Sequence, residues 1–84
     1  MSELLCDECA AVRVGQTTVS RLMEDGFALY KEGIRKDDLK LLRALDKYYE
    51  ALKALKDNNG HLGCISNIDN EHKRLYRSIQ GSRA

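Results

Sequence analysis

Two short pairs of residues in this chain have the types and the spacing of zinc ligands. Cys6 and Cys9 are separated by two residues, and so are His61 and Cys64. A C-x₂-C pair and an H-x₂-C pair together supply the three thiolates and one imidazole of a structural Cys₃His zinc site. Such a site would tie the N-terminal segment to the turn after a long helix, and a small core would gain stability from it.

A second interpretation treats the cysteines as small, buried apolar residues, which is a common role of free cysteine. The Cys6–Cys9 pair contains no glycine and looks helical. The chain has three cysteines, an odd number, and its N-terminus lacks the basic and apolar regions of a secretory signal. These features favour free thiols in a reducing cytoplasm. We therefore expect no metal and no other cofactor, and we keep a structural zinc as the alternative, bound by Cys6, Cys9, His61 and Cys64.

Catalysis has little support in the sequence. The chain contains no glycine-rich phosphate loop, no nucleophile elbow and no H-E-x-x-H motif. His61 and His72 occupy expected turn or surface positions, and a small helical chain leaves little room for a substrate pocket. We expect that the protein is not an enzyme.

The composition predicts a small all-α domain. The chain has 84 residues and no proline, and leucine, alanine, lysine, arginine and glutamate are frequent. No segment alternates apolar and polar residues as a half-buried strand would, and no apolar run approaches the length of a membrane span. We expect one domain over residues 1–84, with three or four helices, a long central helix and no sheet.

The clearest predicted helix covers residues 38–58. Asp37 or Asp38 is a natural N-cap, and Asn58-Asn59-Gly60 is a natural stop. A last helix is expected over residues 66–80, where Ser66 and Asp69 have capping-box spacing. The central helix carries an apolar seam about two heptads long, which needs a partner because it is too short for a stable isolated coiled coil. We expect this seam to form a homodimer, or alternatively to bind a helical protein partner; it consists of Leu41, Leu45, Tyr48, Leu52 and Leu55.

The segment from Val12 to Gly26 has the pattern of the second half of a helix-turn-helix. A second helix is expected to begin near Gln16 and either to break at Gly26 or to continue to about Arg35. Cys9 supplies the small residue at which the two helices cross. The exposed positions of the second helix carry side chains that bond base edges and phosphates, namely Gln16, Thr17, Thr18, Ser20 and Arg21.

The order V-G-Q-T-T-V-S-R-L-M-E-D-G resembles the turn and recognition helix of excisionase-like, MerR-like and small-terminase-like DNA-binding proteins. The resemblance covers about residues 7–26, and it departs from those families at Arg13, where many such turns carry glycine. It implies a helix-turn-helix within residues 3–26 and a small regulatory or accessory protein that binds double-stranded DNA. The alternative function is a non-enzymatic helical protein–protein interaction module, an adaptor or inhibitor, with or without a structural zinc.

Charge sets limits on the partners. The formal net charge of +1 gives no strong overall field toward nucleic acid or an anionic membrane, so no membrane partner is expected. Residues 1–26 contain five acidic and two basic side chains, which disfavours phosphate binding there. The last helix is the most basic region. Its cations suit phosphates or an acidic partner, although a solvated face with favourable cations near a helix C-terminus is the simpler explanation. They are His72, Lys73, Arg74, Arg77 and Arg83.

Overall fold

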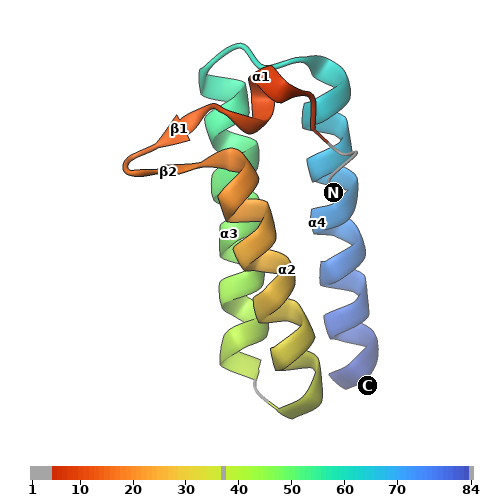
Figure 1. Ribbon diagram of the computed structural model, residues 1–84. Helices are drawn as coiled ribbons and strands as arrows, with labels where there is room; N and C mark the ends of the chain where they lie inside the picture. The colour runs from red at the N-terminus through yellow and green to blue at the C-terminus, as the bar shows by residue number, and fades with distance from the viewer. Residues whose placement is uncertain (1–4, 37, 84) are drawn as a thin grey trace.

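The computed structural model describes residues 5–36 and 38–83. Three antiparallel helices form an elongated bundle with principal extents of 37 × 23 × 22 Å, and a short helix and a hairpin lie at one end (Figure 1). The predominantly helical architecture and the number of helices predicted from the sequence are confirmed for these residues. The elements are α1 (Asp7–Ala10), β1 (Arg13–Val14), β2 (Thr17–Thr18), α2 (Val19–Lys36), α3 (Asp38–Asp57) and α4 (Leu62–Arg83).

The expectation of no sheet is wrong. β1 and β2 form an antiparallel hairpin in which Val14 pairs with Thr17, and Gly15 in the turn has a φ of 65°. Two-residue hairpin turns need positive φ, and the β-branched residues on both sides of Gly15 favour extended backbone. The second helix therefore begins at Val19 and not near Gln16. The Thr18 hydroxyl caps it by accepting a hydrogen bond from the Arg21 backbone N–H at 3.2 Å.

The second helix does not break at Gly26. It continues through Gly26 and Gly33 to Lys36, and both glycines are buried. Of the two alternatives left open by the sequence, the structure therefore contains the continuous helix.

The end of the central helix is as predicted, but the last helix starts earlier. At the end of α3, Asn59 has a φ of 55° and the Gly60 backbone N–H donates to the Leu55 carbonyl at 2.7 Å, which closes the helix. The next helix begins at Leu62, four residues before Ser66, because the His61 carbonyl already accepts a hydrogen bond from the Ile65 N–H at 3.0 Å. As a result α4 has 22 residues and α3 has 20, so the central helix is not the longest among the described residues.

The core lies between the three long helices. Leu55, Ile68 and Val19, one from each of α3, α4 and α2, are its largest fully buried side chains. The predicted seam of α3 is buried within the same chain, except that Leu45 is only partly buried. The homodimer stays a prediction. The seam on which that prediction rests already packs against other helices of the same chain.

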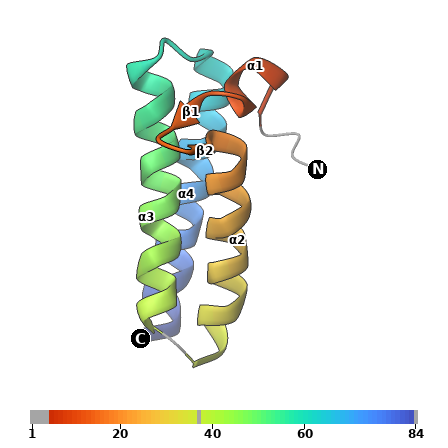
Figure 2. The ribbon, with the colours of Figure 1, turned by 60° about the vertical axis from the view of Figure 1, so that its left-hand side comes forward.

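Alongside the core, the hairpin and α1 cover the end of the bundle at which α3 turns back into α4 (Figure 2). In the part of the chain that the structure describes, no helix combines the length and the hydropathy that crossing a bilayer requires.

Candidate metal centre

Four potential metal ligands meet at the end of the bundle that carries α1. Cys6 and Cys9 come from α1 and its N-cap position, and His61 and Cys64 come from the start of α4. The ligand atoms of these four residues all lie within 4.8 Å of one another. The two pairs are therefore brought together although more than fifty positions separate them in the chain.

The local backbone explains why the two side chains of each pair point in the same direction. In α1 the Ala10 N–H donates to the Cys6 carbonyl at 2.9 Å, so Cys6 and Cys9 lie within a single helical turn. His61 and Cys64 have the same spacing at the start of α4. Residues three apart on a helix lie on one face. Each pair consequently presents both of its ligands to the other pair.

The spacing of the ligand atoms suits a tetrahedral zinc ion. The Cys6 Sγ lies 3.1 Å from the His61 Nδ1 and 3.6 Å from the Cys64 Sγ. Zn–S bonds of about 2.3 Å and Zn–N bonds of about 2.0 Å in a tetrahedron separate ligand atoms by roughly 3.5–3.8 Å. The widest separation, 4.8 Å, has to close by about 1 Å for full coordination.

Backbone amides also support thiolates at this position. The Cys6 N–H donates to the Cys64 Sγ and the His61 N–H donates to the Cys9 Sγ, both at 3.4 Å. Each pair thus provides a hydrogen bond to a sulfur atom of the other. Hydrogen bonds to a thiolate favour its charged form and orient it toward a metal.

Two of the thiols differ in how easily they ionise. The backbone N–H of Cys9 is the main cause that lowers the pKa of Cys6 to about 7. Burial is the main cause that raises the pKa of Cys9 to about 11. Cys6 is half-buried and ionises near neutrality, whereas Cys9 needs a cation at the site to lose its proton.

The four residues that the sequence offers as alternative zinc ligands are therefore close together in the structure. Cys9, which the sequence predicts to be a small packing residue, is only 2% exposed. Its sulfur also belongs to the cluster. The spacing within each pair is visible in the sequence, but only the fold shows that the pairs meet.

The five residues proposed for DNA contact do not share one helix. Gln16 is exposed in the hairpin turn, Thr17 and Thr18 are half-buried in β2, and Ser20 and Arg21 lie in the first turn of α2. A hairpin therefore stands between α1 and α2, where a tight turn was expected. The Arg21 guanidinium forms an exposed ion pair with Asp25 at 3.2 Å.

Similarity to known proteins adds nothing to this geometry. No protein-family model matches the chain, and no curated protein or solved structure is significantly similar to it. A function has to be inferred from the residues themselves.

Proposed function

We propose that the protein is a non-enzymatic, zinc-stabilised interaction module in which Cys6, Cys9, His61 and Cys64 hold one structural zinc ion. The observation that carries the proposal is the convergence of four ligand atoms within 4.8 Å from two distant segments. Three thiolates and one imidazole are a preferred ligand set of structural zinc.

A structural role follows from the number of ligands. Four protein ligands fill a tetrahedral shell, whereas a catalytic zinc keeps one position for water or substrate. The ion would join α1 to the connection between α3 and α4, and so fix the hairpin that follows α1. A chain of 84 residues has little core to spare, so this link contributes directly to folding.

Metal analysis tests the proposal. Protein refolded with zinc is expected to retain one zinc ion per chain, and cobalt in its place is expected to give the absorption bands of a tetrahedral thiolate complex. Cys64→Ser should abolish both signals, while His72→Ala should preserve them because His72 lies outside the cluster. Removal of the ion by a chelator should lower the Tm of the wild type. Wild-type protein that takes up no zinc, and melts alike with and without chelator, would reject the site.

Specific recognition of duplex DNA by Gln16, Thr17, Thr18, Ser20 and Arg21 stays a prediction. Two observations weigh against it: Arg21 is engaged with Asp25, and Asp7 and Glu8 are exposed on α1. If Arg21 contacts a base, Arg21→Ala should weaken specific binding by about 1–3 kcal/mol and leave folding unchanged. Wild-type protein that ignores duplex DNA at low ionic strength would exclude this function.

A further inference from the structure

The net charge of +1 conceals two oppositely charged halves of the molecule. Residues 5–26 and 46–71, which we call the zinc half, contain five basic and nine acidic side chains. Residues 27–36, 38–45 and 72–83, the basic half, contain nine basic and two acidic ones. The end of α2, the start of α3 and the end of α4 lie together, at the end of the bundle away from α1 (Figure 1). The fold thus converts a balanced sequence into a molecule with an acidic end and a basic end.

Within the basic half, the outer face of α4 carries Lys73 and Arg77, both exposed. After Glu71 the described part of this helix contains no acidic residue. Lys73, Tyr76, Arg77 and Gln80 recur at spacings of three and four residues, which places them on one solvent-facing stripe. A shallow surface hollow of about 240 Å³ lies on this stripe, lined by His72, Lys73, Tyr76 and Arg77.

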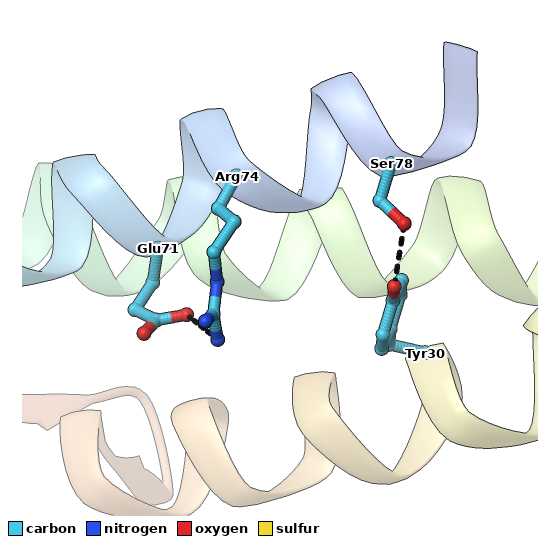
Figure 3. Close-up of polar contacts among 4 residues, drawn as sticks. All are labelled: Tyr30, Glu71, Arg74 and Ser78. Carbon is cyan, nitrogen blue, oxygen red and sulfur yellow. Dashed lines mark hydrogen bonds and ion pairs between the residues drawn. The ribbon is translucent and has the colours of Figure 1, made fainter. Parts of the chain in front are cut away.

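The basic side chains on this helix differ in their ion-pair partners. Arg74 bonds Glu71 at 2.9 Å on the side that faces α2, where Tyr30 also bonds Ser78 (Figure 3). Lys73 pairs with Asp69 at 3.0 Å in an exposed contact that solvent competes with. Arg77 has no ion pair with any residue that the structure describes. Its guanidinium is therefore the group most open to an external anion.

An aromatic ring lies between these cations. Tyr76 is 49% exposed, and its hydroxyl accepts a hydrogen bond from the Gln80 side chain at 2.9 Å. This bond holds the ring along the helix surface with one part of it open to solvent. Exposed aromatic rings beside lysine and arginine provide stacking positions for the bases of single strands.

We propose that the outer face of α4 binds single-stranded nucleic acid, with Arg77 and Lys73 on the phosphates and Tyr76 stacked on an unpaired base. The composition of the stripe favours this ligand over an anionic membrane. A helix that lies on a membrane needs several large apolar residues beside its basic ones, and Tyr76 is the single large apolar side chain among those that define the stripe. The proposal names a partner for the interaction module, but it rests on α4 and not on the zinc site.

The test is the affinity of zinc-loaded protein for a labelled oligothymidylate of about 12 nucleotides, measured by fluorescence anisotropy at low ionic strength. Arg77→Glu is expected to weaken binding by about tenfold or more, and added salt should weaken wild-type binding. Lys56→Glu is the matched control, because it makes the same charge change at an exposed position in the zinc half and should retain most of the affinity. Equal losses in the two variants, or no binding by the wild type, would overturn the proposal.

A second pair of variants tests the stacking. Tyr76→Ala should weaken binding of the single strand by about fivefold or more, and Tyr76→Phe should restore it because the ring is kept. Duplex DNA that binds as tightly as the single strand and is insensitive to Tyr76→Ala would reject the single-strand assignment. Binding to phosphatidylserine vesicles without binding to the oligonucleotide would reject nucleic acid altogether.

Zinc content is measured in every variant, which separates this inference from the proposed function. Oligonucleotide binding by a protein that takes up no zinc would sustain the α4 proposal and reject the zinc site.

Discussion

Gly26 lies so close to Tyr48 that a Cβ atom at position 26 would come within 2.6 Å of the Cδ1 and Cε1 atoms of the ring. The contact recurs two turns later, where a Cβ at Gly33 would approach the Leu41 backbone nitrogen to 2.8 Å. Both glycines lie inside α2 and face α3. They let the two helices approach closely, and this packing compensates for the weaker helix propensity of glycine.

Gly26→Ala is therefore expected to destabilise the protein, although alanine is the better helix former. Tyr48 is 3% exposed and its rigid ring has little room to move, so overpacking should lower the free energy of unfolding by about 1–3 kcal/mol. Urea denaturation followed by the helical circular dichroism signal measures the change. Gly81→Ala is the control, because a Cβ there meets nothing within 4 Å and should be neutral or mildly stabilising. A Gly26→Ala protein as stable as the Gly81→Ala protein would contradict the close packing.

Tyr48 should also make the protein less stable in alkali. Burial is the main cause that raises the pKa of Tyr48 from 10.0 to about 12. Between these values the unfolded chain releases the phenol proton and the folded chain keeps it. The free energy of unfolding consequently falls as the pH rises above about 10, by about 1–2 kcal/mol from this group.

Tyr48→Phe removes that contribution while it keeps the ring. Denaturation of both proteins at neutral pH and at about pH 11 measures the difference. We expect the wild type to lose more stability than the variant over this interval. Parallel losses in the two proteins would show that the Tyr48 hydroxyl ionises as freely when folded as when unfolded.

Zinc affinity should rise with pH because protons compete for the ligands. With a pKa of about 11, Cys9 is protonated at neutral pH in the absence of metal, and Cys6, with a pKa of about 7, is partly protonated. Binding must release at least the Cys9 proton, so the apparent affinity should increase about tenfold or more per pH unit between roughly pH 6 and pH 8. Competition with a chromophoric chelator of known pH dependence measures this slope. A flat profile would exclude Cys9 as a thiolate ligand.

The seam of α3 gives a prediction about the core. Leu52 is buried and Leu42 is 49% exposed, so Leu52→Ala should cost about 2–5 kcal/mol and Leu42→Ala less than about 1 kcal/mol. Thermal or urea unfolding measures both. Similar costs for the two variants would show that α3 uses a different face from the one described.

The predicted homodimer needs a separate measurement. Sedimentation velocity across the micromolar range distinguishes a monomer from a dimer. Because Leu52 and the other buried seam residues already pack inside the chain, a dimer has to use another surface. A monomer at every concentration would contradict the predicted homodimer and leave the core prediction unchanged.

Local signals in the sequence were sufficient for much of the fold. The capping signal at Asp37 or Asp38, the stop at Asn58-Asn59-Gly60 and the apolar spacing between them predicted α3 almost to the residue, because caps and periodicity act within one helix. Asp37 itself lies outside the described residues. The hairpin was missed although its signal is present: β-branched residues on both sides of Gly15 favour extended strands over a helical turn. The cysteine and histidine spacing likewise defined two ligand pairs.

Other features depend on contacts between distant segments, and the tertiary structure alone decided them. Whether Gly26 ends α2 depends on Tyr48, which a pattern within α2 does not contain. The Cys6–Cys9 and His61–Cys64 pairs form one cluster because α4 starts beside α1, at the end where α3 finishes. The basic half exists because the antiparallel packing of α2 and α3 and the length of α4 bring residues 27–36, 38–45 and 72–83 to the same end of the bundle (Figure 1). Net charge is a sum over the chain, whereas the field that a partner meets depends on where those charges lie in space.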